Sequence, residues 1–256
     1  MRDKLRALIA QLRLHGMADA LDAEIQRAER EAIAAPELLY RLLGQEAASR
    51  RERSLAYRLV QARLPWRWSL DSFPFDRQPG VSKTQIQTLA GLDFLRRADN
   101  VLLIGKPGTG KTGLAIGLLR EACLNGYRGR FTNAQVLLDE LYASLADRTT
   151  TRLLAQLSRM QPLLIDELGY LTIKPEQANA FFRLMDQRYA RVSTIITTNL
   201  DLSDWYELFD KKPLVDALID RLQHHCITIR IDGPSLRSPD PAPPPPVSPK
   251  RRTTQA

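Results

Sequence analysis

A glycine-rich segment near the middle of the chain has the residue types needed to hold a phosphate chain. It has the spacing Gly-x-x-x-x-Gly-Lys-Thr and reads Gly105-Lys106-Pro107-Gly108-Thr109-Gly110-Lys111-Thr112, with Gly113 directly after it. Glycines let backbone N–H groups turn toward phosphate oxygens, and the N-terminus of a following helix adds a positive end. The lysine would reach the β- and γ-phosphates and the threonine hydroxyl would bind Mg²⁺. The segment therefore predicts a P-loop that binds ATP and Mg²⁺.

After the P-loop segment and one further predicted strand–helix pair, an apolar run ends in two carboxylates. The run Leu163-Leu164-Ile165 leads into Asp166 and Glu167. An apolar strand of a parallel sheet would deliver Asp166 beside the P-loop, where it can hold Mg²⁺ through water. Glu167 would then polarise the attacking water as a general base. The pair predicts hydrolysis of the bound triphosphate.

Two further side chains could complete such a site. The β-branched run Thr194–Thr198 ends at Asn199, and ligands bind at the carboxyl ends of strands in open parallel sheets. Asn199 is therefore expected to orient the water or to touch the γ-phosphate. Arg221 lies late in a predicted helix, where its guanidinium could neutralise phosphoryl charge in a neighbouring subunit. The alternative for Arg221 is a surface ion pair with a neighbouring carboxylate.

The elements that must position these residues alternate between strand and helix from Asn100 onward, which predicts a parallel sheet. The expected strands are 100–104, 129–132, 163–166, 194–198 and 227–231. The expected helices are 111–125, 134–146, one that ends near 160, 175–190 and 214–225. Residues 1–64 instead have helical periodicity, with the first break at 15–17 and later helices at 18–34 and 36–63. The fold class is therefore α/β, with a five-stranded parallel sheet preceded by a small all-helical domain.

The division of the chain follows from composition. Residues 1–64 form the helical domain, and Pro65 opens an irregular connector over 65–82 that Phe73 and Phe75 should anchor on the next domain. Residues 83–237 form the nucleotide-binding domain. The proline-rich stretch 238–256, with its basic cluster, is expected to be a disordered tail.

The charge balance favours a polyanionic partner. The formal charge is +8, and the segment from 41 to 70 holds seven arginines against two glutamates. It also contains Tyr57, Trp66 and Trp68, which could stack on or pack against a ligand. The alternative is a solvated helix face with core aromatics. The segment predicts contact with double-stranded DNA through Arg50, Arg51, Arg53, Arg58, Arg63 and Arg67.

The remaining composition indicates the compartment. No apolar run approaches the length of a membrane span, and the N-terminus lacks the pattern of a secretory signal. Only Cys123 and Cys226 are present, in apolar surroundings that suggest buried thiols. A cytoplasmic location without membrane contact is expected.

The motifs together resemble the IstB-like branch of the AAA+ ATPases, helper proteins of IstA/IstB-type insertion sequences that are related to DnaC helicase loaders. The likeness extends from about 12 to 237. Besides the P-loop it rests on the runs Leu12-Arg13-Leu14-His15-Gly16-Met17, Asp166-Glu167-Leu168-Gly169-Tyr170, Ser193–Asn199 and Ala217–Leu222. The family closes with Gly-x-Ser-Tyr-Arg, whereas this chain has leucine at the tyrosine position, so no nucleotide-sensing role is assigned to Arg237.

The resemblance implies an AAA+ core of three αβα layers. It implies that Asn199 is sensor 1 and that Arg221 is an arginine finger acting on a neighbouring subunit. ATP would drive a homo-oligomer to assemble on duplex DNA, with the helical N-terminus gripping the duplex. That assembly would recruit an IstA-type transposase and stimulate integration.

Three other functions remain open at this level. A DnaC-like replicative helicase loader would share the ATPase core. A P-loop kinase would transfer phosphate to a small metabolite, although Glu167 and Asn199 favour water as the acceptor. A scaffold would use ATP only to lock an oligomer.

Overall fold

The molecule is built on a sheet of five parallel strands. The computed structural model describes residues 1–169, 171–209 and 212–237, so Tyr170 and the predicted tail from residue 238 lie outside it. The strands are β1 (Asn100–Gly105), β2 (Arg130–Asn133), β3 (Leu163–Asp166), β4 (Thr194–Thr198) and β5 (Cys226–Ile231). Their spatial order is β2-β3-β4-β1-β5, with every neighbouring pair parallel. The predicted five-stranded parallel sheet is confirmed.

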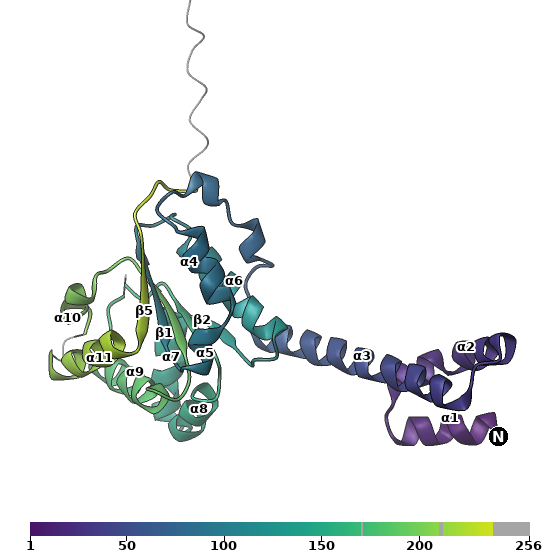
Figure 1. Cartoon of the computed structure of the whole chain (residues 1–256). Helices are drawn as coiled ribbons and strands as arrows, with labels where there is room; N and C mark the ends of the chain where they lie inside the picture. Colours follow the sequence, from purple (N-terminus) through teal and green to yellow (C-terminus); the bar gives the residue numbers. More distant parts are fainter. Residues whose placement is uncertain (170, 210–211, 238–256) are drawn as a thin grey trace, which may run out of the picture.

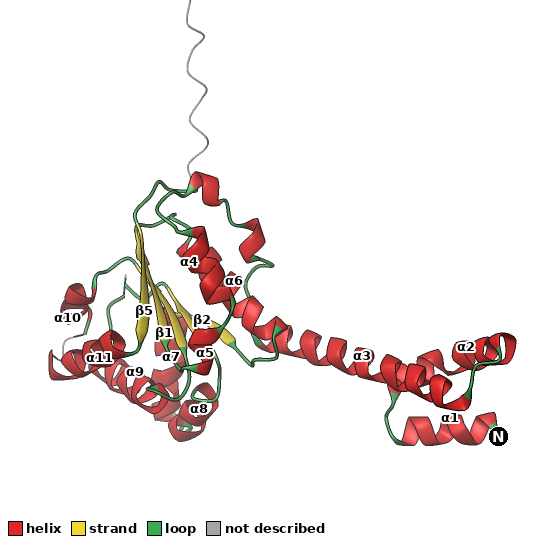
Figure 2. Ribbon diagram, in the orientation of Figure 1, coloured by secondary structure: helices red, strands yellow, loops and turns green. Residues whose placement is uncertain are grey.

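Helices cover both faces of this sheet (Figures 1 and 2). One face carries α4 (Lys83–Ala90), α5 (Asp93–Arg96) and α6 (Lys111–Leu124). The other carries α7 (Ala134–Ala146), α8 (Thr150–Leu157), α9 (Pro175–Arg188), α10 (Trp205–Leu208) and α11 (Lys212–His224). Successive strand side chains point to opposite faces, so Val101 and Leu103 join one core whereas Leu102 and Ile104 join the other. The three-layer αβα architecture follows from this alternation.

Three helices precede the sheet and form a helical arm: α1 (Arg2–Gln11), α2 (His15–Glu31) and α3 (Ala35–Gln61). Helix α2 begins at His15, so the break expected at 15–17 lies instead at 12–14. The buried carboxylate of Glu46 on α3 explains the earlier start, because it accepts hydrogen bonds from the N–H groups of Gly16 (2.8 Å) and Met17 (3.3 Å). Hydrogen bonding from Arg50 and from these N–H groups lowers the pKa of Glu46.

Gly16 is also the point of closest approach between α2 and α3. A Cβ at this position would lie 2.6 Å from the Cβ of Ser49 and 2.7 Å from the carbonyl oxygen of Gln45. Only glycine fits there, so the sequence run around Gly16 fixes the packing of the arm. A small core of Ile9, Met17, Leu21 and Leu42 fills the space between the helices.

The long helix α3 leads from α1 and α2 to the sheet (Figure 1). Its last turn is fixed there by two hydrogen bonds: Arg58 Nε donates to the carbonyl of Cys123 on α6 (2.9 Å), and Phe131 N on β2 donates to the carbonyl of Ala62 (2.8 Å). Because β2 is an edge strand, the second bond satisfies one of its free N–H groups. The arm is therefore joined to the sheet at the edge formed by β2.

The connector after α3 folds along α6 and contains two short 3₁₀ helices, Leu70–Ser72 and Phe75–Arg77. Phe73 is buried against the β1–α6 side of the sheet, as expected of an anchor, and its ring contacts Phe75 edge to face. In the described part of the chain, no helix is long and apolar enough to cross a lipid bilayer.

Candidate functional site

The loop between β1 and α6 has the geometry of a phosphate cradle. Gly108 and Gly110 have φ angles of +82° and +93°, in the left-handed region that glycine adopts most readily. Lys111 begins α6, and its Nζ donates to the carbonyl oxygens of Gly105 (2.7 Å) and Lys106 (2.8 Å). Burial lowers the pKa of Lys111. A desolvated ammonium group beside a helix N-terminus favours a bound anion.

Asp166 lies directly beside this loop, as expected. Its Oδ1 accepts hydrogen bonds from the hydroxyls of Thr112 (2.8 Å) and Thr197 (2.6 Å). Burial raises the pKa of Asp166, and the two hydroxyl donors oppose that rise. Mg²⁺ in nucleotide sites takes one or two protein oxygens and completes its shell with phosphates and water. The oxygens of Thr112 and Asp166, in contact with each other, fit that requirement.

Glu167 is exposed at the end of β3 and is held by its neighbours. Its backbone has a φ of +59°, an uncommon conformation for a residue with a side chain. Its N–H donates to Thr197 Oγ1 (2.9 Å), and its Oε2 accepts from Asn133 Nδ2 (3.1 Å). The tight turn therefore directs the carboxylate outward, where it can meet solvent or a ligand.

Asn199 follows β4, which lies between β3 and β1. Its Oδ1 would lie only 2.2 Å from a Cβ at Gly169, so the glycine after Leu168 is needed for Asn199 to occupy this position. A cavity of about 530 Å³ brings Asn199 together with Lys111, Thr112 and Glu167. Three segments distant in sequence therefore meet at the carboxyl edge of the sheet, where ligands of open α/β sheets bind.

Arg221 is not in this cavity. It lies near the C-terminus of α11, where its guanidinium pairs with Asp186 (2.8 Å) and stacks over the Tyr189 ring at 5.5 Å. Its neighbours include Asn100 and Thr194, the first residues of β1 and β4. At about 3.3 Å per residue, the length of a strand separates it from the P-loop of its own chain. Arg221 is therefore too far from the P-loop of its own chain to contact a nucleotide held there.

The six arginines predicted to contact DNA fall into two groups. Arg50 and Arg53 pair with Glu46 (2.6 and 3.4 Å), and Arg63 lies 3.6 Å from Glu140, all with exposed side chains. Arg51 and Arg67 are also exposed. Arg58 differs, because it is half-buried and its Nε joins α3 to α6. Five of the six are therefore at the surface, whereas Arg58 has a structural contact.

Sequence reasoning missed two residues that hold the carboxylates. Thr197 contacts both Asp166 and Glu167, and Asn133 holds Glu167. Asn133 is the last residue of β2 and is in register with Asp166, so polar residues at the ends of adjacent strands were the available signal. The cavity is also lined by Trp66, Trp68 and Arg237, which approach it from the connector and from the end of β5.

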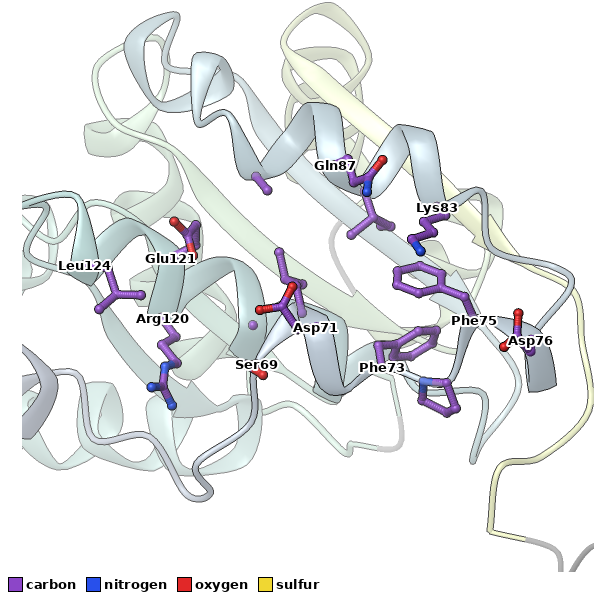
Figure 3. A pocket seen from close by; sticks show the side chains of 15 residues that line it. Ser69, Asp71, Phe73, Phe75, Asp76, Lys83, Gln87, Arg120, Glu121 and Leu124 are labelled. Carbon is purple, nitrogen blue, oxygen red and sulfur yellow. The ribbon is translucent and has the colours of Figure 1, made fainter.

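A second hollow lies along the connector, between it, α4 and α6 (Figure 3). Its volume is about 580 Å³, and it is lined by acidic Asp71, Asp76 and Glu121 and by basic Lys83 and Arg120. None of the residues predicted to bind nucleotide or to act in hydrolysis lines it. Lys111, Thr112, Glu167 and Asn199 instead line the cavity at the sheet edge.

Comparison with known proteins decides the family. A family profile described as IstB-like ATP binding protein matches residues 7–241. The chain belongs to this family. It is 38% identical over 234 residues to a Pseudomonas aeruginosa protein named as an ATP-binding protein of insertion sequence IS21, covering 91% of this chain and 88% of that protein. The family predicted from the motifs is confirmed.

The fold of this IstB-like protein is that of solved AAA+ proteins. A crystal structure of DnaI superposes with a TM-score of 0.57 at 20% identity and covers 65% of this chain and 92% of that one. A crystal structure of the DnaC helicase loader gives a TM-score of 0.50 at 23% identity, with coverages of 58% and 87%. At these identities the likeness shows the fold alone, and it confirms the predicted AAA+ core.

Proposed function

We propose that this IstB-like protein is an ATP hydrolase that assembles on duplex DNA in its ATP-bound form and assists a transposase. The observation that carries the proposal is the single cavity at the sheet edge, which joins the P-loop to Glu167 and Asn199. A triphosphate bound there would have a carboxylate and an amide near its terminal phosphate. Such groups position water, and the proposal therefore names hydrolysis and not transfer to a metabolite.

Each residue at the cavity has a defined task in this proposal. The backbone N–H groups of the loop and the ammonium group of Lys111 bind the phosphates. Thr112 and Asp166 would hold Mg²⁺, which supplies charge neutralisation at the β- and γ-phosphates. Glu167 accepts a proton from the attacking water, and Asn199 orients that water. Transfer of this proton to Glu167 leaves hydroxide to form the new bond to phosphorus as the bridging P–O bond breaks.

The site would be completed by a second copy of the chain. Arg221 cannot reach its own cavity, yet a guanidinium near the transferring phosphoryl group accelerates such reactions by about 10³-fold or more. Its contacts with Asp186 and Tyr189 hold it partly exposed, at 36% of the side-chain area. An oligomer that places this end of one subunit against the sheet edge of the next would unite the two halves of the site.

The DNA and transposase parts of the proposal rest on the arm and on the family. Arg50, Arg51, Arg53, Arg63 and Arg67 give α3 and the start of the connector an exposed basic surface suited to phosphates. Relatives of this chain are named for insertion sequences, which move by transposition. A replicative helicase would be the partner if the protein were instead a helicase loader, and affinity capture with both candidate partners separates the two functions.

Mixing of two inactive variants tests the shared site. Lys111→Ala removes the phosphate-binding ammonium group, and Arg221→Ala removes the group offered to the neighbour. Each variant alone should release phosphate from ATP at least about 100-fold more slowly than the unmodified chain in the presence of duplex DNA. An equimolar mixture should recover part of the lost activity, because some subunit pairs contain an intact P-loop facing an intact Arg221.

The control for the mixing experiment is the Lys111→Ala/Arg221→Ala double variant. It should stay inactive when mixed with either single variant, because neither mixture contains both an intact P-loop and an intact Arg221. No recovery in the Lys111→Ala and Arg221→Ala mixture would contradict a site shared between subunits. Phosphate release by Arg221→Ala at the unmodified rate would remove this residue from the reaction altogether.

A further inference from the structure

The cavity at the sheet edge is lined by two chemically different sets of residues. One set is Lys111, Thr112 and Glu167, which suit phosphates, a cation and water. The other set is the side chains of Trp66 and Trp68 from the connector. Trp66 is 60% exposed, an unusual state for so large an aromatic side chain. An exposed indole at the rim of a ligand cavity needs an explanation.

The connector is held against α6 by three glycines that lie on one side of the helix and its preceding loop. A Cβ at Gly110 would lie 2.6 Å from Phe73, and one at Gly117 would lie 2.5 Å from Leu70. Between them, a Cβ at Gly113 would lie 3.0 Å from Cε2 of Trp68. These contacts fix the indole of Trp68 against Gly113, in the first turn of α6 and directly beside the residues predicted to hold phosphate.

The cavity that holds the two indoles is also lined by apolar and backbone groups and by Arg237. Leu236 and the loop residues Pro107 and Gly108 line the same cavity. The indole N–H of Trp68 is buried and has no hydrogen-bond acceptor among the described residues. Ring faces and aliphatic groups suit a flat heterocycle, since every base has a π face that can stack on an aromatic side chain.

The size of the cavity supports a ligand longer than a phosphate chain. Its volume of about 530 Å³ lies within the range of about 300–1,000 Å³ that is usual for sites of small molecules and cofactors. Phosphates over the loop would leave the ribose and base directed along the first turn of α6. That path leads past Gly113 to the two indoles.

We propose that Trp66 and Trp68 hold the base of the nucleotide, Trp66 by stacking on its face and Trp68 as the wall beside Gly113. This proposal rests on the proposed nucleotide site and assigns its base-binding residues. It gives the connector a role in nucleotide affinity that the P-loop alone does not explain. Because Trp66 follows the end of α3 by five residues, a bound base would also contact the segment that carries the helical arm.

Comparison of ATP with inorganic tripolyphosphate separates base binding from phosphate binding. In the full chain with Mg²⁺, Trp66→Ala should weaken ATP binding about tenfold while tripolyphosphate binding changes less than about twofold, as expected for loss of one base–aromatic stack. Trp66→Phe should keep most of the ATP affinity, because it retains a ring face. Trp68→Phe should lose less than Trp66→Ala for the same reason.

Tryptophan fluorescence provides a second readout and a matched control. The chain has three tryptophans, and Trp205 is fully buried in the core on the opposite face of the sheet. ATP should quench the emission of the unmodified chain, whereas tripolyphosphate should not. In the Trp66→Phe/Trp68→Phe variant only Trp205 emits, and ATP should leave its emission unchanged.

The outcomes distinguish failure of this inference from failure of the proposed function. ATP affinities of Trp66→Ala and Trp68→Ala equal to that of the unmodified chain would place the base elsewhere and overturn the inference. Loss of duplex DNA binding by Trp66→Ala with unchanged ATP binding would also overturn it, because Trp66 would then be a DNA contact. If the unmodified chain bound neither ATP nor tripolyphosphate, the nucleotide site itself would be wrong. A variant that still binds tripolyphosphate has kept a folded P-loop.

Discussion

The sheet edge and helix α3 both carry charged side chains, but they hold them in different ways. At the edge, Asp166 is buried and accepts two hydroxyl hydrogen bonds, and Glu167 is held through both its N–H and its carboxylate. On α3, Arg51 is exposed to solvent, and Arg50, whose side chain is also exposed, pairs with Glu46 one turn away. The sheet edge therefore holds its carboxylates in defined positions, whereas helix α3 concentrates positive charge at the surface.

This difference teaches which chemistry each region can perform. General base catalysis requires a group within hydrogen-bond reach of a particular proton, so the edge must hold its side chains in fixed positions. Attraction of a phosphate backbone depends on the number and position of cations and tolerates mobile side chains. We therefore expect ATP turnover to depend on single functional groups at the sheet edge. Duplex binding by α3 should depend on the number of positive charges and not on whether they come from arginine or lysine.

The largest effect is expected for Glu167→Gln, which retains the shape of the side chain and removes its charge. Without a proton acceptor for water, turnover of ATP should fall by about 10²–10⁴-fold. ATP and DNA binding should be retained, since neither uses this carboxylate. Phosphate release and nucleotide binding by the same preparation check the two halves of the prediction. Unchanged turnover would remove Glu167 from the reaction.

A smaller effect is expected from reversing charge on the basic surface. Arg51→Glu combined with Arg67→Glu should weaken duplex binding by more than about tenfold. It should also make the plot of log affinity against log salt concentration less steep by about two units, because each lost phosphate contact contributes about 0.9 to the slope. ATP turnover without DNA should be unchanged. Titrations of a labelled duplex at several salt concentrations measure both quantities.

The matched control for charge reversal is Arg51→Lys combined with Arg67→Lys. Because the proposal requires only charge at these positions and no fixed geometry, the lysine pair should bind duplex DNA within about twofold of the unmodified chain. Equal losses in the lysine and glutamate pairs would show that α3 recognises its ligand by geometry, and the contrast between the two regions would disappear.

The smallest effect at the edge is expected for Asn133, which orients Glu167 without touching the predicted phosphate. Asn133→Ala removes one hydrogen bond to the carboxylate of Glu167, so the turnover of ATP should fall by about tenfold while the affinity for ATP stays the same. Steady-state kinetics should show the change in kcat and not in KM. An altered KM with unchanged kcat would mean that Asn133 contributes to nucleotide binding instead.

The core of the nucleotide site could be predicted because its signals are local. The P-loop, Asp166 and Glu167 each stand within a short run whose spacing already implies a strand, a loop and a helix. Asn133 was missed because the strand before it was expected to end at 132, one residue early. That single step leaves Asn133 outside the sheet and conceals its pairing with Asp166.

Contacts between distant segments could not be predicted in this way. The start of α2 depends on Glu46, which lies 30 residues after Gly16, and the structural contact of Arg58 depends on a carbonyl of α6. From the sequence, Trp66 and Trp68 were expected only to stack on or pack against a ligand or to belong to the core. Only the path of the connector along α6 brings them to the cavity at the sheet edge.

Sedimentation of a labelled DNA duplex with the Glu167→Gln variant, with and without ATP, tests the central claim most directly. This variant should keep ATP bound without hydrolysis, so ATP should convert the duplex into one species that carries several protein subunits. Without ATP the duplex should sediment with little or no protein, and Lys111→Ala should behave in that way even with ATP. Equal binding of protein to the duplex with and without ATP would contradict ATP-dependent assembly on DNA.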